Sequence, residues 1–283
     1  MMDALITGAG GFIGQSLRAR LRADGQNVLA LTSANGDVGS ADTWKTLPRA
    51  RVLYHLAGRS FVPDSWAQGP DFVATNVVGT ERALAYCREH GARLVLASAY
   101  VYGIPERLPI GESDTVAPNN PYALSKYLAE QLCEFAAQYQ GVTATALRIF
   151  NVFGPGQREE FLVPKILQQV KDKEAREIRL FDLAPRRDYV FLSDVVDAFA
   201  KAADLDTGFH AINVGSGMSL SVAEIVDKIQ VIAGSRLPVV SDYVERNQEI
   251  PDVVADIARA QQIMGWRPQW SFERGIEQIL KRV

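Results

Sequence analysis

The stretch TGAGGFIG at residues 7–14 most constrains the fold, because it joins a short apolar run to a helical pattern over 11–24. Glycines at such a junction, here Gly8, Gly11 and Gly14, let the backbone approach a phosphate and let the helix pack closely on the strand. The N–H groups and the dipole of the helix N-terminus stabilise a pyrophosphate there. The stretch therefore predicts a dinucleotide site, with a tight, closely packed turn as the alternative.

Apolar runs rich in Val, Leu and Ile follow along the first half of the chain and are typical of strands buried on both faces. The runs lie at 3–9, 27–32, 51–57, 92–98 and 143–150, and helical patterns lie between them at 11–24, 69–90 and 120–140. This alternation predicts an α/β fold, a Rossmann doubly wound parallel sheet. Because SANGDVG at 33–39 has no helical period, we expect no helix between the second strand and a short third strand at Asp37 and Val38.

Prolines divide the chain after residue 150 into short pieces, which predicts a smaller C-terminal lobe. We assign 1–150 to an NAD(P)-binding Rossmann domain, with 187–214 returning to it, and 151–186 and 215–283 to a substrate-binding lobe. SVAE at 221–224 is a capping box and marks the start of one helix in that lobe.

Composition argues against several kinds of partner. Thirty Lys+Arg against 33 Asp+Glu give a net charge of -3, so no global field favours nucleic acid or an anionic membrane. The two cysteines and three histidines lack metal-ligand spacing, and we expect no metal site. The first residues show no secretion signal, and no apolar run approaches membrane length. We therefore expect a cytoplasmic protein, and we also expect a homodimer.

A tyrosine and a lysine lie four positions apart in NPYALSK at 120–126. One helical turn separates Tyr122 from Lys126, so both side chains leave the same face, although such pairs are common on ordinary helices. Ser98, in ASAYVYG, ends a predicted strand at the edge where open α/β sheets bind ligands. In a shared site, Lys126 would favour the phenolate of Tyr122, and Ser98 would hydrogen-bond the reacting oxygen.

The residues at the end of the second predicted strand help to predict whether NAD or NADP is the cofactor. NAD-binding proteins of this fold usually place an acidic residue there to hold the ribose, whereas this chain has Thr32 or Ser33. No carboxylate would repel a 2′-phosphate, but no arginine follows at once to bind one, and Arg18 on the first helix is the remaining candidate. We expect NAD(P), with a lean to NADP.

Together the motifs resemble the extended short-chain dehydrogenase/reductases of the NAD(P)-dependent nucleotide-sugar epimerase/dehydratase family. The resemblance runs from residue 4 to about 273 and rests on TGAGGFIG, HLAG, ATNVVGTERAL, SAYVYG, PYALSK, RIFNVFGPGQ, RRDYVFLSDVVDA, INVGSG and ADIARAQQIMGWRP, in the family's order. It implies a nucleotide-sugar substrate and a catalytic set of Ser98, Tyr122 and Lys126.

The resemblance also implies roles for residues outside the catalytic set. Asn76 would help to order the active-site helix. The cofactor would be contacted by Phe12 and Ile13 of the glycine stretch, by Thr32 at the end of the second strand, by Asp37 and Val38 near the adenine, and by Leu56, Ala57 and Gly58 along its backbone path. Asn151, Arg187 and Arg246 would grip the diphosphate of the substrate. Arginine suits that task, although either arginine could instead be a surface charge paired with Glu245 or Glu249.

The two residues after Ser98 limit which reactions of the family this chain could catalyse. Dehydratases of the family carry an acidic residue or pair there, whereas this chain has Ala99 and Tyr100, which cannot exchange the protons at C5 and C6. HLAGRSFVPDSW, FNVFGPGQREEF and RNQEIP resemble GDP-4-keto-6-deoxymannose reductases more than UDP-galactose 4-epimerases, although Ala34 departs from the arginine frequent in such reductases. We expect reduction of the C4 ketone of a nucleoside-diphosphate 4-keto-6-deoxyhexose, with 4-epimerisation as the alternative and a non-catalytic dinucleotide sensor as a remote one.

Overall fold

A computed structural model describes residues 1–243 and 250–281 of the chain. At its centre lies a six-stranded parallel sheet in the order β2-β1-β3-β4-β5-β9. The strands are β1 (Met2–Thr7), β2 (Val28–Leu31), β3 (Ala50–His55), β4 (Arg93–Ala99), β5 (Ala144–Ile149) and β9 (Phe209–Val214). The predicted Rossmann sheet is confirmed, because the apolar runs of the sequence form its first five strands.

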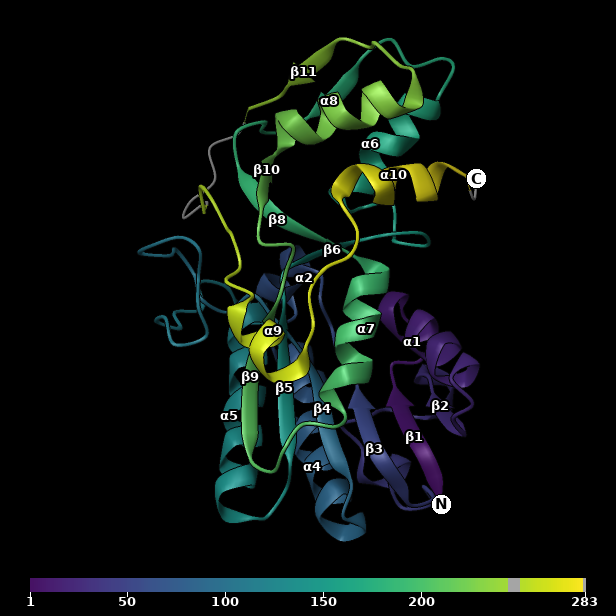
Figure 1. The fold of residues 1–283 in the computed structure, drawn as a ribbon, viewed down its shortest axis with the longest axis vertical. Helices are drawn as coiled ribbons and strands as arrows, with labels where there is room; N and C mark the ends of the chain where they lie inside the picture. Colours follow the sequence, from purple (N-terminus) through teal and green to yellow (C-terminus); the bar gives the residue numbers. More distant parts are fainter. Residues whose placement is uncertain (244–249, 282–283) are drawn as a thin grey trace.

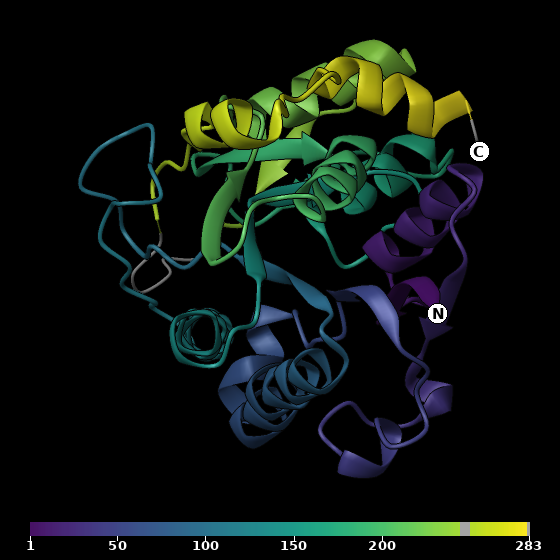
Figure 2. The ribbon, with the colours of Figure 1, turned by 60° about the horizontal axis from the view of Figure 1, so that its bottom comes forward.

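Helices cover both faces of this sheet, as Figure 2 shows. One face carries α1 (Phe12–Ala23), α7 (Leu192–Ala202) and α9 (Ala258–Met264), and the other carries α4 (Gly79–His90) and α5 (Pro121–Tyr139). Strand β4 illustrates why its sequence is apolar without alternation. Val95 and Ala97 join the core under α1 and α7, whereas Leu94 and Leu96 join the core under α4 and α5. A strand buried on both faces needs apolar residues at successive positions.

The smaller lobe lies beyond the carboxyl ends of the central strands (Figure 1). It contains the sheet β10-β8-β6, the pair β11-β7 and three helices around a core of their own. The bounds are β6 (Asn151–Phe153), α6 (Leu162–Lys171), β7 (Ile178–Leu180), β8 (Arg186–Phe191), β10 (Ser219–Ser221), α8 (Val222–Ala233), β11 (Val239–Ser241) and α10 (Phe272–Lys281). The predicted capping box is present, since Ser221 Oγ accepts from Glu224 N (3.1 Å) and the Glu224 carboxylate accepts from Ser221 N (2.7 Å).

The two parts of the chain interleave more than the sequence suggested. Strand β8 was expected to return to the large domain, yet it pairs with β6 and β10 in the small sheet. Helix α9 was expected in the lobe, yet it packs in the core shared by α1 and α7. Strand β9 does return to the central sheet, where it pairs with β5.

The connection from β2 to β3 contains two 3-10 turns, η1 (Ser33–Asn35) and η2 (Ala41–Thr43), and no α-helix. The missing helix was predicted correctly, but the short strand expected at Asp37 and Val38 is wrong. The Asp37 carbonyl accepts from Thr43 Oγ1 (2.6 Å), and the Val38 carbonyl accepts from the Trp44 indole (2.8 Å). The Thr43 and Trp44 side chains thus donate to the carbonyls that would otherwise accept hydrogen bonds from a neighbouring strand.

The helix expected over 69–90 forms, and a π-helical segment lies between its two α-helical parts. After α2 (Val62–Ala67), the chain forms α3 (Gly69–Phe72), a π-helical segment (Val73–Val78) and then α4. A π-helical turn is rare and often lies at a functional site. Here it contains the buried Asn76, one of the residues expected near the cofactor.

Within 1–243 and 250–281, no helix is both long and apolar enough to cross a membrane. The same residues contain no group of three or more His, Cys, Asp or Glu side chains that could hold a metal ion. Cys87 and Cys133 are both buried free thiols.

Candidate active site

The glycine stretch and the segment after β3 meet at one point of the sheet edge. Strand β1 has β2 on one side and β3 on the other, so the connections from β1 and β3 leave in opposite directions and open a switch point. Gly8 has φ +67°, and a Cβ there would lie 2.6 Å from Ala57 N. Leu56 N in turn donates to Thr7 O (3.2 Å), and Ala57 N donates to Thr7 Oγ1 (3.2 Å). The glycine is required because no side chain fits between the two loops.

Helix α1 begins directly at this switch point. Its N-cap is Gly11, whose N–H donates to Gly8 O (2.9 Å). A Cβ on Gly14 would lie 2.9 Å from Ala9 Cα and would overlap Gly8 O. Phe12 and Ile13 begin the helix as half-buried residues that pack against the core below. The chain therefore closes tightly around the free N–H groups of the helix, which is the arrangement that a pyrophosphate needs.

Thr32 lies next to the glycine stretch, at the end of β2. A Cβ on Gly10 would lie 3.3 Å from Thr32 Cγ2, so the two segments are in contact. Thr32 N and Oγ1 both donate to Asn35 Oδ1, at 2.8 and 3.1 Å, which closes a capping box over the 3-10 turn. Asp37 is exposed and accepts from Gly39 N (2.9 Å), whereas Val38 is buried against Gly79. Thr32, Asp37 and Val38 thus lie in the segment that follows β2, and contact with a cofactor stays a prediction for them.

Helix α5 carries the tyrosine and lysine pair into the same edge. The helix starts at Asn120, whose Oδ1 accepts from Ala123 N (2.9 Å), so Tyr122 and Lys126 fall in its first two turns. The Lys126 side chain is buried, and its ammonium donates to Ala97 O (2.8 Å). A Cβ on Gly58 would lie 3.0 Å from Lys126 Nζ. Lys126 and the loop after β3 therefore adjoin.

Asn76 connects that loop to helix α5. Its Oδ1 accepts from Arg59 N (2.9 Å), and its Nδ2 donates to Arg59 O (3.1 Å) and to Ser125 Oγ (2.8 Å). Ser125 Oγ in turn donates to the carbonyl of Tyr122 (2.7 Å). One buried amide thus links the loop after β3 to the turn of α5 that carries Tyr122, and its role in ordering the active-site helix stays a prediction.

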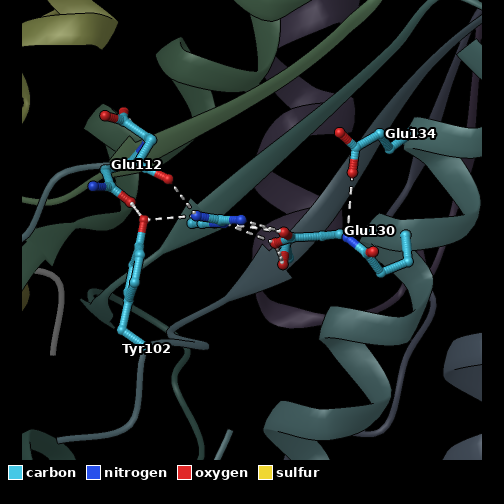
Figure 3. A network of polar contacts seen from close by, with 8 residues as sticks. Tyr102, Glu112, Glu130 and Glu134 are labelled. Carbon is cyan, nitrogen blue, oxygen red and sulfur yellow. Dashed lines mark hydrogen bonds and ion pairs between the residues drawn. The ribbon is translucent and has the colours of Figure 1, made fainter. Parts of the chain in front are cut away.

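Ser98 lies near the end of β4, and its hydroxyl donates to the buried carboxylate of Glu130 on α5. Figure 3 shows Glu130 within a network that extends to Tyr102 and Glu112. Arg148 joins these groups, because its Nη2 donates to Glu130 Oε2 (2.8 Å) and its Nη1 donates to Tyr102 Oη (2.9 Å). Sequence reasoning missed this network. One signal was available, since Glu130 follows Lys126 by one helical turn and must share the buried face of α5.

Burial controls the protonation of the pair on α5. It raises the pKa of Tyr122, so the phenol is neutral. It lowers the pKa of Lys126 to about 8, against the opposing effect of the Glu130 charge. In this structure the ammonium of Lys126 donates to Ala97 O and burial raises the pKa of Tyr122, so the expected stabilisation of the phenolate by Lys126 stays a prediction. A neutral phenol is a proton donor, the form that reduction of a carbonyl requires.

His55, at the end of β3, is buried beside this pair. Its Nδ1 lies 2.8 Å from Thr7 Oγ1, and burial, followed by the charge of Lys126, lowers its pKa to about 3. The imidazole is therefore a neutral packing group rather than a base.

The residues expected to grip the diphosphate lie on the small sheet. Asn151 begins β6 opposite Tyr189 of β8, and their side chains are hydrogen-bonded. Arg187 lies two residues before Tyr189 and is half-buried, and its Nη1 donates to Ile250 O (2.6 Å). Burial raises the pKa values of Tyr100 and Tyr189, and the positive charge of Arg187 partly opposes this rise, so its field reaches the end of β4. Arg246 lies outside the described residues.

Phe181 follows β7 in the small lobe. The residue is 51% exposed and so lies outside the core, and the ammonium of Lys165 lies 5.0 Å from the centroid of its ring.

The fold and this edge define an NAD(P)-dependent oxidoreductase of the extended short-chain type, with a tyrosine and a lysine on one helix beside a dinucleotide switch point. Comparison with known proteins agrees. The chain belongs to the NAD dependent epimerase/dehydratase family, whose model matches residues 4–215. The family and its relatives confirm the predicted class, an NAD(P)-dependent nucleotide-sugar enzyme.

Two relatives and one solved structure illustrate the range of the similarity. The chain is 29% identical to the GDP-6-deoxy-D-mannose reductase of Pseudomonas aeruginosa, over 97% of this chain and 95% of that protein. It is 30% identical to the UDP-glucose 4-epimerase of Mycolicibacterium smegmatis, over 99% and 98%. The structure of RMD from Pseudomonas aeruginosa complexed with NADPH is similar with a TM-score of 0.90 and 28% identity, over 100% of both chains.

Proposed function

We propose that the protein reduces the C4 ketone of a nucleoside-diphosphate 4-keto-6-deoxyhexose with NADPH or NADH. The observation that carries the proposal is the pair of residues directly after Ser98, at the end of β4. Ala99 is a buried methyl, and the Tyr100 hydroxyl donates to Gly103 O (2.5 Å), so neither can exchange a proton at C5. This argues against dehydration and leaves reactions confined to C4. Similarity to a GDP-6-deoxy-D-mannose reductase supports reduction, and similarity to a UDP-glucose 4-epimerase keeps epimerisation as the alternative.

The described residues fit a dinucleotide. The turn at Gly8 and Gly14 excludes side chains beside the N-terminus of α1, and Gly58 leaves space beside Lys126. When bound, NAD(P)H supplies the hydride. Tyr122, neutral through burial, would donate the proton to the oxygen at C4, and Ser98 would contact that oxygen. Lys126 and Asn76 would hold the loop after β3 and helix α5 in place around the nicotinamide ribose.

We propose NADP rather than NAD as the preferred cofactor. The residues at the end of β2 are Thr32, Ser33, Ala34 and Asn35, and none of them is acidic. A 2′-phosphate would therefore meet no carboxylate at this turn, and Arg18 on α1 is the candidate cation. The structure of RMD from Pseudomonas aeruginosa, which is complexed with NADPH, supports the same preference for NADP. The ratio of kcat/KM for NADPH and NADH measures the preference.

We further propose that Asn151 and Arg187 contact the diphosphate of the substrate, and that the lobe binds the nucleotide sugar. The charge of Arg187 and its position on the strand next to Asn151 support this role. Arg246 remains a prediction of the same kind. A homodimer acting in the cytoplasm also remains a proposal, which sedimentation and cell fractionation would test.

The fate of the cofactor distinguishes the reactions. A reductase must release its oxidised cofactor after every turnover, whereas an epimerase keeps it to return the hydride. We expect the purified protein to consume one NAD(P)H per 4-keto-6-deoxy sugar nucleotide reduced, measured by the loss of reduced-nicotinamide absorbance against product formed. If it instead carries tightly bound NAD and interconverts UDP-glucose and UDP-galactose without net consumption, the epimerase alternative replaces the proposal. Cofactor binding without any turnover would indicate a dinucleotide sensor.

A further inference from the structure

Tyr100 lies beside the reacting end of the candidate site. It is the second residue after Ser98 and the first after β4, so the two Cα atoms are at most about 7 Å apart. The residues of β4 that follow Arg93 are all buried, whereas Tyr100 is half-buried. Tyr100 is therefore the first side chain after Ser98 that has exposed surface to offer to a bound molecule.

Two aromatic neighbours hold the ring of Tyr100. Its centroid lies 5.6 Å from that of Tyr102 and 5.5 Å from that of Phe150, and both contacts are edge-to-face. Tyr102 and Phe150 are themselves buried. Because an edge-to-face pair has a specific geometry, the ring of Tyr100 is held in one orientation.

The hydroxyl of Tyr100 already has a partner. It donates to Gly103 O (2.5 Å) in the same loop. Gly103 is fixed in turn, because it has φ +70° and a Cβ there would overlap Ala117 O. A phenol has a single hydrogen, so Tyr100 has none to donate to a ligand while this bond is intact. What the side chain offers is the apolar surface of its ring.

This ring lies between the two ends of the proposed substrate. Phe150, on which it packs, directly precedes Asn151 of β6. Ile250 packs against the cluster that contains Phe150, and its carbonyl accepts from Arg187 Nη1 (2.6 Å). A nucleotide sugar with its C4 at Ser98 and its diphosphate at Asn151 and Arg187 would therefore place its hexose beside the ring.

The chemistry of the hexose decides which of its carbons suits this surface. C4 adjoins C3, which carries a hydroxyl, and C5, which carries a methyl group in a 6-deoxyhexose and a hydroxymethyl group in an ordinary hexose. A hydroxyl that is buried against carbon without a partner costs free energy, whereas a methyl group gains from the contact. The ring of Tyr100 therefore suits C5 and its methyl group.

We propose that Tyr100 selects 6-deoxyhexoses, because its fixed ring packs on the C6 methyl group and donates no hydrogen bond to a C6 hydroxyl. This selectivity rests on the proposed function for the positions of C4 and of the diphosphate. It adds a residue that distinguishes substrates at C6 and leaves the roles of Ser98 and Tyr122 at C4 unchanged.

Binding measurements test the selectivity without turnover. The ligands are pairs that differ only at C6, namely GDP-mannose with GDP-6-deoxymannose, UDP-glucose with UDP-6-deoxyglucose, and dTDP-glucose with dTDP-6-deoxyglucose. Each is titrated with NADP⁺ into the Tyr122→Phe protein, which should oxidise neither sugar. For the nucleobase that binds most tightly, we expect the 6-deoxy sugar to bind about tenfold more tightly than its partner. Equal affinities would overturn the proposal.

Two substitutions of similar size separate an apolar wall from a side chain that only fills space. Tyr100→Leu keeps an apolar surface, whereas Tyr100→Gln presents an amide that can bond to a C6 hydroxyl. Both lose the bond to Gly103 and the edge-to-face contacts. We expect the Leu protein to keep the preference for the 6-deoxy sugar and the Gln protein to lose it. The same ratio of affinities in both would contradict the selection at C6.

Tyr100→Phe covers the case in which the Leu or Gln protein does not fold. It keeps the ring and removes only the hydroxyl, so the preference should remain as in the protein with Tyr100. A lost preference in this variant would show that the hydroxyl, and not the ring, distinguishes the sugars.

The outcome for C6 is separate from the outcome for the reaction. If the protein reduces no 4-keto-6-deoxy sugar but prefers 6-deoxy ligands through Tyr100, the proposed function fails and the selectivity stands. If it reduces such a sugar but binds both members of a pair equally, the selectivity fails and the proposed function stands.

Discussion

Lys126 places a charged group away from water, because its side chain is buried and its ammonium donates to the carbonyl of Ala97. Burial lowers its pKa from 10.5 to about 8. The unfolded chain therefore holds the proton more tightly than the folded chain between pH 8 and 10.5. Burial of the ammonium therefore lowers the free energy of unfolding by the full amount below pH 8. This destabilisation disappears as the pH rises from 8 to 10.5. A shift of this size corresponds to roughly 3 kcal/mol.

We predict that Lys126→Met is inactive yet unfolds at a higher urea concentration than the wild type at pH 7. The gain should be at most about 3 kcal/mol, reduced by the lost bond to Ala97 O, and should shrink toward pH 10. Its cofactor affinity should also fall, because the ammonium adjoins Gly58. Tyr122→Phe is the matched control, which should lose turnover and keep cofactor affinity. A Met variant that is less stable than wild type at pH 7 would contradict the cost assigned to burial.

At the scale of elements, the junction of β1 and α1 depends on one close approach. A Cβ on Gly14 would lie 2.9 Å from Ala9 Cα and would overlap Gly8 O, so the helix would have to move away from the strand. We predict that Gly14→Ala costs about 1–3 kcal/mol of unfolding free energy and lowers NAD(P) affinity at least tenfold, measured by denaturation and by titration.

Gly69→Ala serves as its control. Gly69 begins α3 and has open space where a Cβ would lie, so the substitution should leave both stability and cofactor affinity near wild type. Equal effects of the two substitutions would show that the approach at Gly14 is not critical.

At the scale of the whole molecule, Asp188 ties the small sheet to the segments that leave the large one. This buried residue of β8 accepts from Ser216 N (2.5 Å) and Ser216 Oγ (2.7 Å) through Oδ1. Its Oδ2 accepts from Gly217 N (2.9 Å) and Ala255 N (3.1 Å). One carboxylate thus joins β8, the turn after β9 and the segment that leads to α9.

We predict that Asp188→Asn destabilises the protein by about 2–4 kcal/mol, because an amide has one acceptor oxygen and would turn its NH₂ toward two N–H donors. Denaturant unfolding measures the change. Asp182→Asn is the control, since Asp182 accepts from Ala184 N (2.9 Å), a bond that an amide oxygen can replace. A loss of less than about 1 kcal/mol at Asp188 would mean that the lobe is held mainly by other contacts.

The sequence by itself determined the first five strands of the central sheet and the class of protein. The central strands are apolar at successive positions because both faces are buried, and that requirement is legible within each run of β4 or β5. The close approach of Gly14 to Ala9, the capping box at Ser221 and the pair of Tyr122 and Lys126 depend on neighbours within a few residues. Their geometry therefore follows from local spacing.

The tertiary structure alone decided which distant groups share an environment. Ser98 meets Glu130 and Arg148 only because β4, β5 and α5 fix a register between segments far apart in the chain. The same dependence explains why β8 and α9 lie elsewhere than the sequence predicted. The hydrogen bonds of β8 come from β6 and β10, and α9 is buried in the core shared by α1 and α7. Local pattern records whether a residue is buried, but the identity of its partner is set by contacts between segments far apart in sequence.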